Sequence, residues 1–345
     1  MDGAEVSAEL AAKFEELSAL EQEFEDAELE IIRKAEDIQA PLYKKRADFV
    51  KNIPHFWSLV FEQAPPEIDN FIQPTDSKVF AECLDTFEVS RFELNDPNGS
   101  PRSFSLKFGF TENEYFEDKV LEKKFWFRKT KDWAGLVSEP VKINWKKDKD
   151  LTAGLTDAAY KLGEARKRAS ADTSDGKARK AEVNTKEYKD LAKKIETATD
   201  ASISFFGIFA FVSGYRWVSA EENEQVVRED KEKFEKIKRG EKVDEDEDEE
   251  MEDPQDYQEI EVFPGGDEVA TILAEDMWSN AIKYYKGTFD EEMDDEELSD
   301  LDVMDADSDD DDAEDDSDEE VDIRALVGKG RKSDKPPPAK KQRKA

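Results

Sequence analysis

The chain holds one histidine, His55, and one cysteine, Cys83, so the side chains that most often act as nucleophile or general base are scarce. A Ser-His or Cys-His pair would have to use His55. That residue lies between Pro54 and Phe56 at the expected end of a helix, where packing or capping is a better interpretation than catalysis. A single cysteine excludes an intramolecular disulfide and a cysteine-based zinc cluster, and it is typical of a reducing compartment.

Two patterns begin like ligand-binding loops without completing them. The two glycines at 265–266 lack the further glycines and the Lys-Ser/Thr pair of a phosphate-binding loop. Asp305, Asp307 and Asp309 have the spacing that opens a calcium loop, but Asp310 stands where that loop needs a glycine. We therefore expect no catalytic residues, no cofactor and no metal.

Acidic residues dominate what remains. The 345 residues include 88 Asp and Glu against 51 Lys and Arg, which gives a formal net charge of −37. Such a charge repels nucleic acid phosphates and attracts basic proteins. Charged residues make up 40% of the chain, so part of it cannot bury a core, yet 22 Phe and 6 Trp indicate a real folded unit. We expect one α+β domain with charged appendages and a cationic partner.

The first element that must position these charges is a long N-terminal helix, from about Ser7 to about Ile53. Its apolar residues recur in steps of three and four, which is the period of a helix. A helix of roughly 65 Å is too long to pack along one small domain. The near-3.5 repeat favours a second copy over another part of the same chain as the partner. The predicted dimer contacts are Leu10, Phe14, Leu17, Leu20, Phe24, Ile31 and Ile38. Pro41 predicts a kink, and Pro54 ends the helix.

The middle of the chain reads as an antiparallel sheet with packed helices. A short buried helix is predicted within 55–70, and a hairpin from segments 79–94 and 103–111 around turn residues 95–99. Further strands are predicted at 124–129 and 141–145, a buried strand at 204–215, and a packed helix at 266–285. The apolar stretch 204–215 is well short of the ~20 residues that span a bilayer, so no membrane partner is expected.

Two charged insertions interrupt this domain, at about 156–200 and about 220–261. The first is read as a solvated helical or disordered segment, and the second contains seven consecutive acidic residues at 244–250. A basic cluster in the first is most simply a solvated face, with weak DNA contact as the alternative. That cluster consists of Lys161, Arg166, Lys167 and Arg168.

The C-terminal region changes the sign of its charge. Segment 289–323 has many Asp and Glu and no Lys or Arg, which predicts a disordered acidic tail. Segment 324–345 is basic, and two clusters around a Pro-containing spacer predict a nuclear import signal. The alternative is a basic end that folds back on the acidic tail. The clusters consist of Lys329, Arg331, Lys332, Lys340, Lys341, Arg343 and Lys344.

Several blocks resemble the SET-like branch of the nucleosome assembly protein family. They are the helix and its exit at 28–57, then YFEDKVLEKKF at 115–125, INWKKDKDLT at 143–152, SFF at 204–206 and GDEVATILAEDMWSNAIKYY at 266–285. Their order matches the family across most of 10–297, although the two insertions depart from its compact pattern. The resemblance implies residues 1–53 as a dimerisation helix, 54–288 as an earmuff-shaped lobe, and a histone chaperone without catalytic activity.

The resemblance also implies the partners. Core histones, as the H3-H4 pair, the histone 2A–2B pair or both, are expected to bind an acidic lobe surface and the acidic tail during nucleosome assembly, disassembly and chromatin remodelling in the nucleus. The predicted contacts are Asp267, Glu268, Glu275 and Asp276, which are otherwise ordinary solvent-side helix charges. The alternative function is an acidic interaction hub or phosphatase inhibitor that binds histones only incidentally.

Overall fold

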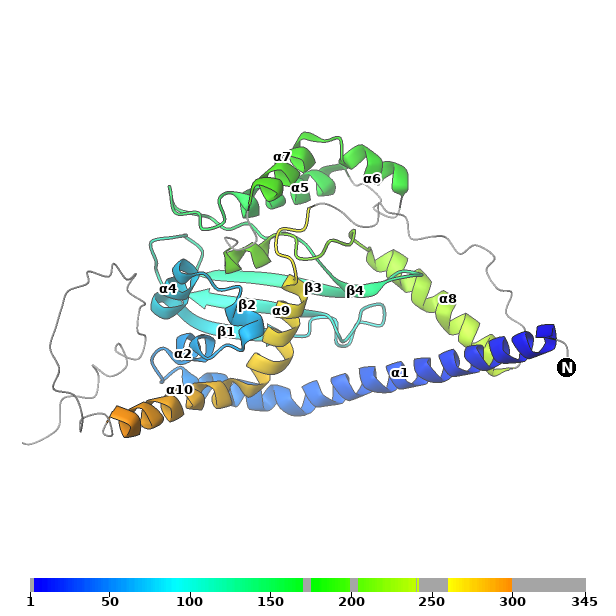
Figure 1. Ribbon diagram of the computed structural model, residues 1–345, viewed down its shortest axis with the longest axis horizontal. Helices are drawn as coiled ribbons and strands as arrows, with labels where there is room; N and C mark the ends of the chain where they lie inside the picture. Colours follow the sequence, from blue (N-terminus) through cyan, green and yellow to red (C-terminus); the bar gives the residue numbers. More distant parts are fainter. Residues whose placement is uncertain (1–2, 170–174, 199–203, 240, 242–259, 300–345) are drawn as a thin grey trace, which may run out of the picture.

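The computed structural model describes residues 3–169, 175–198, 204–239, 241 and 260–299, with the backbone alone at 3–12, 15 and 290–299. The first element is helix α1 (Gly3–Val50), which runs through Pro41 without ending there. Figure 1 shows α1 passing under the lobe, with its N-terminal half extending beyond it. The expected helix of about 7–53 is therefore confirmed in type, with both ends shifted by a few residues. None of the described helices is long and apolar enough to cross a membrane.

Three short helices follow α1, and prolines mark the starts of two of them. They are α2 (Phe56–Glu62), α3 (Pro66–Asp69) and α4 (Pro74–Cys83). In α4 the side chains of Gln73 and Asp76 form a capping box, which fixes the helix start. The predicted first strand, 79–94, was therefore wrong at its beginning, because residues 79–83 belong to this capped helix.

Four antiparallel strands form one sheet in sequence order: β1 (Leu84–Ser90), β2 (Phe104–Phe110), β3 (Val120–Lys129) and β4 (Ala134–Ser138). The predicted hairpin is β1–β2, where Phe87 lies opposite Phe108. The predicted strand 141–145 was wrong, since only Trp145 makes a single bridge, to Phe116. The fourth strand is instead β4, whose Ala and Gly have little strand propensity.

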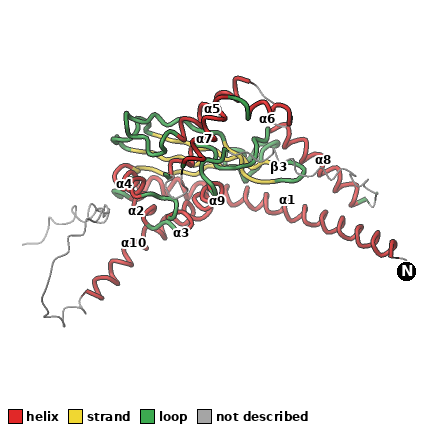
Figure 2. The backbone as a smooth tube through the Cα atoms, turned by 45° about the horizontal axis from the view of Figure 1, so that its top comes forward, coloured by secondary structure: helices red, strands yellow, loops and turns green. Residues whose placement is uncertain are grey.

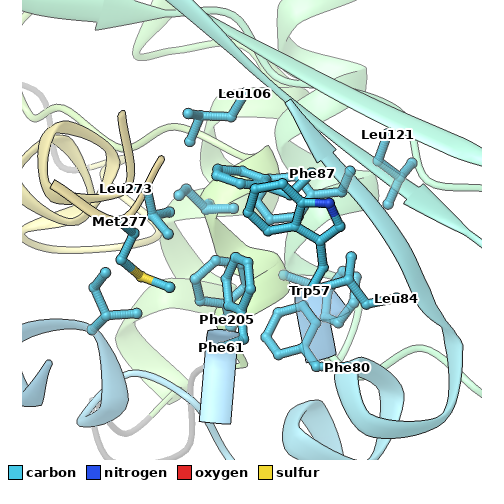
Figure 3. Packing of buried hydrophobic residues seen from close by; sticks show 14 of the residues in the cluster. Trp57, Phe61, Phe80, Leu84, Phe87, Leu106, Leu121, Phe205, Leu273 and Met277 are labelled. Carbon is cyan, nitrogen blue, oxygen red and sulfur yellow. The ribbon is translucent and has the colours of Figure 1, made fainter. Parts of the chain in front are cut away.

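The main core lies on one face of the sheet. Figure 3 shows Trp57, Phe61 and Phe80 from the helices packed with Phe87 of β1. Segment 204–215 completes this core but is no strand: it forms the 3-10 helix η2 (Phe205–Phe209) followed by extended chain. Buried Asp76 accepts hydrogen bonds from the Ser204 hydroxyl at 2.6 Å and from the Phe205 amide at 2.7 Å. This carboxylate therefore joins the start of α4 to η2.

The first insertion is more ordered than its composition suggested. It forms α5 (Leu155–Ala169), α6 (Gly176–Glu182) and α7 (Lys186–Thr197), which Figure 1 shows on the side of the sheet away from α1. Leu162, Tyr188 and Leu191 are buried there with Phe211 and Val262 in a second core. Of the two forms expected for this insertion, the helical one is confirmed. The expectation that it is solvated was wrong, because few but well-spaced apolar residues meet across α5 and α7.

The remaining helices are α8 (Ala220–Lys238), α9 (Gly266–Ile272), the π-helical turn η3 (Leu273–Met277) and α10 (Trp278–Ser299). In Figures 1 and 2 α8 runs from the sheet to the N-terminal half of α1, against which it packs. The predicted helix 266–285 is present, with non-helical dihedral angles at Asn280. Because α10 continues to Ser299, the first residues of the predicted disordered tail are helical, and the rest lie outside the described residues together with 244–250 and the import clusters.

Candidate functional site

Helix α1 carries a row of exposed apolar side chains. Residues three, four or seven apart lie on one helical face, and the members of this row are 48–72% exposed. We call them the apolar stripe: Phe14, Leu17, Leu20, Phe24, Ile31, Ile38, Leu42 and Phe49. Leu10 also belongs to the predicted set, but its side chain lies outside the described residues. The dimer prediction did not include Phe49, although it follows Leu42 by seven residues and is the most exposed of the row.

Positions beside and away from the stripe are held by contacts within the same chain. Arg102, beyond the β1–β2 turn, pairs with Glu25 at 2.7 Å and with Glu28 at 3.1 Å. Lys238 at the end of α8 pairs with Glu23 at 3.1 Å, and Ala19 is buried. The helix is therefore anchored on one side and leaves its apolar stripe uncovered.

A buried arginine joins the end of α1 to the lobe. The guanidinium of Arg46 lies 4.1 Å from the ring of Trp278 and 4.9 Å from that of Tyr43, and it donates to the Trp278 carbonyl. Burial lowers the pKa of Arg46 to about 10. Arg46 lies in the block 28–57 that carries the family resemblance, but its role was not predicted, because its partner Trp278 comes from a helix 232 residues later.

The four predicted acidic contacts do not act as one group. Glu275 pairs with Arg91 at 3.2 Å. Its neighbour Asp276 accepts hydrogen bonds from the Asn280 amide at 2.6 Å and from the Tyr284 hydroxyl. Burial together with Asp276 raises the pKa of Tyr284 to about 12. Asp267 and Glu268 lie a helical turn or more earlier, in the first turn of α9. Of the four, Glu275 alone therefore pairs with a cation of the described chain.

Carboxylates that were not predicted lie near the start of α9. Helix α3 packs against α9, and the ring of Phe71 lies 5.1 Å from that of Phe263. Burial and the nearby charge of Asp267 raise the pKa of Glu261. Glu67 of α3 is close enough to Tyr284 to contribute to the rise of its pKa.

These residues define the acidic surface. No member of it forms an ion pair with a Lys or Arg in the part of the chain that the structure describes. Other described carboxylates also lack such a partner, and this set differs from them because α3 packs on α9 and because Asp267 lies close enough to Glu261 to act on its pKa. Its members are Glu67, Asp69, Glu261, Asp267, Glu268 and Asp276.

The basic cluster of the first insertion is partly neutralised. Arg166 makes two hydrogen bonds to the carboxylate of Glu182, at 2.6 and 2.9 Å. Lys167 pairs with Glu139 at 3.0 Å. Lys161 and Arg168 are exposed. The four cations therefore do not form one free patch.

His55 and Cys83, the residues first considered for catalysis, occupy positions that the fold explains. His55 is the N-cap residue of α2, with a φ of 57° and no side-chain cap hydrogen bond. Cys83 is buried, which raises the pKa of its thiol to about 11 and keeps it protonated at neutral pH. Within the described ranges, no group of three His, Cys, Asp or Glu side chains is placed to hold a metal ion.

Residues 7–288 match the sequence profile of the nucleosome assembly protein (NAP) family. The chain belongs to this family. A Schizosaccharomyces pombe protein named for nucleosome assembly is 39% identical over 154 residues, covering 41% of this chain and 61% of its own length. Protein SET of Drosophila melanogaster is 30% identical over 160 residues, covering 45% of this chain and 55% of its own. The chain therefore spans little more than half the length of these two relatives.

A longer alignment extends to NAP1-related protein 1 of Oryza sativa, 24% identical over 85% of this chain and 83% of that protein. Among solved structures, a Ccp1 mutant aligns over 83% of this chain and 99% of its own, with 24% identity and a TM-score of 0.49. The Vps75 histone chaperone aligns over 80% and 98%, with 20% identity and a TM-score of 0.45. Membership of the family rests on the profile match over 7–288.

Proposed function

We propose that this NAP-family protein is a histone chaperone, a homodimer whose acidic surface binds core histones and assists nucleosome assembly and disassembly. The observation that supports it most is the set of six carboxylates without internal counter-ions around α3 and α9. The chaperone title of Vps75 and the names of the assembly-protein relatives agree with it. Exposed ion pairs contribute only ~0–1 kcal/mol each, so a histone held by several of them can be released to DNA.

The functional test is nucleosome assembly with the full-length protein. Mixed with relaxed plasmid DNA, a topoisomerase and both H3-H4 and the histone 2A–2B pair at ~0.15 M salt, the ionic strength where exposed charges remain partly effective, it should prevent histone–DNA precipitation and introduce supercoils. Polyglutamate at equal carboxylate concentration is the control for charge alone. Equal performance of polyglutamate would favour the alternative of an acidic hub with incidental histone binding.

The dimer is proposed to form through the apolar stripe. Burying eight large side chains at ~1.5 kcal/mol or more each offsets the entropy cost of association. The spacing of the stripe is nearly symmetric about Ile31: Phe24 and Ile38 lie seven residues to either side, and Leu20 and Leu42 lie eleven. An antiparallel pair with its two-fold axis at Ile31 therefore places apolar residues opposite each other along the helix.

Cysteine pairing tests this register. Ile31→Cys should cross-link to itself in the other copy under mild oxidation, because the two-fold axis brings the two side chains together. Asp26→Cys, exposed on the lobe-facing side of α1, is the control that should stay monomeric on a non-reducing gel. The native Cys83 is buried and should not interfere. Cross-linking at Asp26 but not at Ile31 would reject the register.

Nuclear import by the terminal basic clusters remains part of the proposal. Replacing Lys340, Lys341, Arg343 and Lys344 by Ala should move a tagged protein to the cytoplasm. Unchanged nuclear accumulation would refute the signal and favour pairing of this end with the acidic tail.

The proposal includes contact of the first insertion with DNA, supported by exposed Lys161 and Arg168. Replacing both by Gln should lower the affinity of a histone-loaded chaperone for a DNA duplex at low salt. The same replacement should leave histone binding itself unchanged.

A further inference from the structure

A cleft of about 240 Å³ lies between α1, the end of β1 and the η3–α10 segment. Part of its wall is apolar, and Ile32, Ala35, Val89 and Trp278 are among the lining residues. Two carboxylates line it from different elements: Glu36 comes from α1 and Glu275 from η3. No member of the acidic surface lines this cleft, so it is a separate feature of the lobe.

The cleft holds more negative charge than positive charge. Arg91 donates a hydrogen bond to Glu275 at 3.2 Å. It also donates to the Pro101 carbonyl at 2.9 Å, and its side chain is only 14% exposed, so its position is fixed by the surrounding fold. The side chain of Glu275 is 53% exposed. Glu36 forms no ion pair with any described residue. Two carboxylates therefore face one internal cation, which leaves one negative charge without a partner.

The aromatic rings of the cleft contribute surface area more than charge recognition. The guanidinium of Arg46 already lies 4.1 Å from the Trp278 ring and 4.9 Å from the Tyr43 ring. A second cation at these rings would meet the repulsion of Arg46. What the cleft offers is an apolar wall for an aliphatic stem and a pair of carboxylates for a positive end, which are the two halves of a long basic side chain.

We propose that this cleft binds one lysine or arginine side chain of a basic protein, with the stem on the apolar wall and the cation between Glu36 and Glu275. In the proposed register, helix α1 of the second copy does not supply that cation. The α1 residues of the cleft run from Ile31 to Tyr43, and the register about Ile31 places residues 19–31 of the other copy opposite them. That stretch contains six acidic residues and no Lys or Arg, so dimerisation adds negative charge beside the cleft.

A small probe tests the cleft without any histone. In the full-length protein labelled with fluorotryptophan, the signal of Trp278 can be assigned by its loss in Trp278→Phe. Nα-acetyl-lysine amide and Nα-acetyl-arginine amide should shift this signal in a saturable way, and the norleucine amide, which has a similar stem without the charge, should bind far more weakly. A response to norleucine equal to that of lysine would overturn the proposal.

Variants of the charged cleft residues test the proposal, because they should change lysine-amide binding in opposite directions. Glu36→Gln and Glu275→Gln should each weaken lysine-amide binding by about two- to fivefold, the range expected for one partly exposed ion pair. Arg91→Gln should strengthen it, because the competing cation is removed. Glu122→Gln, exposed on the outer face of the sheet, is the matched control and should have no effect. Unchanged binding in both cleft Gln variants, or weaker binding in Arg91→Gln, would overturn the site.

The assignment of the bound lysine or arginine to a histone rests on the proposed function. The double variant Glu36→Gln/Glu275→Gln should then lower the affinity for H3-H4 or for the histone 2A–2B pair by at least threefold, about the effect of one exposed ion pair, while the dimer stays intact. Lysine-amide binding with unaltered histone affinity in the double variant would overturn the histone as source and leave the cleft standing. Failure of the wild-type protein to bind histones at all would overturn the proposed function instead.

Discussion

The apolar stripe of α1 and the acidic surface around α3 and α9 are both left without partners by the described chain, but for opposite physical reasons. The stripe exposes side chains whose burial is favourable in any salt, since the hydrophobic effect depends on area. The acidic surface brings like charges together, and burial together with the nearby charge of Asp267 raises the pKa of Glu261. Its attraction for a partner is Coulombic and is screened over ~8 Å at physiological salt.

This difference suggests how one chain combines a lasting contact with a transient one. Apolar contacts require matched spacing, and the symmetry of the stripe about Ile31 supplies it for an identical copy. Charge contacts tolerate many geometries, and each exposed pair is weak enough to exchange. We therefore expect the dimer to be insensitive to salt and histone binding to be sensitive to it.

The largest effect is expected at the stripe. Phe24→Asp or Ile31→Asp should convert the dimer to a monomer at micromolar concentration, because the carboxylate would be desolvated in the helix pair at a cost of several kcal/mol. Light scattering measures the mass directly. Ser18→Asp adds the same charge to an exposed position off the stripe and should remain dimeric. A wild-type monomer at the same concentration would refute the dimer outright.

The next largest effect is expected at the acidic surface. Replacing Glu67, Asp267 and Glu268 by their amides should weaken histone binding by roughly tenfold at 0.15 M salt, from three pairs of ~0–1 kcal/mol each, and by much less in high salt. Calorimetry at two salt concentrations measures both. Replacing Glu229, Glu232 and Glu235, exposed on α8, by Gln removes the same charge elsewhere. An equal loss in this control would mean that net charge, not the surface, binds histones.

Features with a local cause were predictable from the sequence. The period of α1, the β1–β2 hairpin and the helix from residue 266 follow from spacing and turn residues within short windows. The run 204–215 was not assigned correctly, because a short apolar run reads alike as buried strand or buried helix. Strand β4 was missed because pairing with β3, not its Ala and Gly, determines its conformation.

The residues of the candidate site also differ in whether the sequence alone could identify them. Asp267 and Glu268 could be selected because they open a recognisable helix, whereas Glu67 and Glu261 belong to the acidic surface only through the packing of α3 on α9. Separation of Glu275 from Asp276 depends on Arg91, which lies 184 residues away in sequence. Contacts of that range leave no periodic signal in one sequence.

A smaller, kinetic effect is expected from the tail. Deleting residues 300–323 removes 15 carboxylates without touching the described lobe. Histone association should slow and its salt dependence should flatten, because distant exposed charges act mainly by steering. Dissociation should change less, since short-range contacts determine the off-rate. Stopped-flow measurement of both rates decides this, and complete loss of binding on deletion would move the histone site from the acidic surface to the tail.

The smallest effect is a proton released when a histone binds. Burial and Asp267 raise the pKa of Glu261, so the free protein retains a proton there at a pH somewhat above the ordinary carboxyl range. A bound cation stabilises the charged form and lowers that pKa. Between the two pKa values the complex holds fewer protons than the free protein, so affinity should rise as pH increases through this window, and one proton or less should leave on binding. Calorimetry in this pH window, in two buffers of different ionisation heat, measures the release. Glu261→Gln should abolish most of it while leaving the dimer unchanged, and an identical release in that variant would assign the proton to another carboxylate.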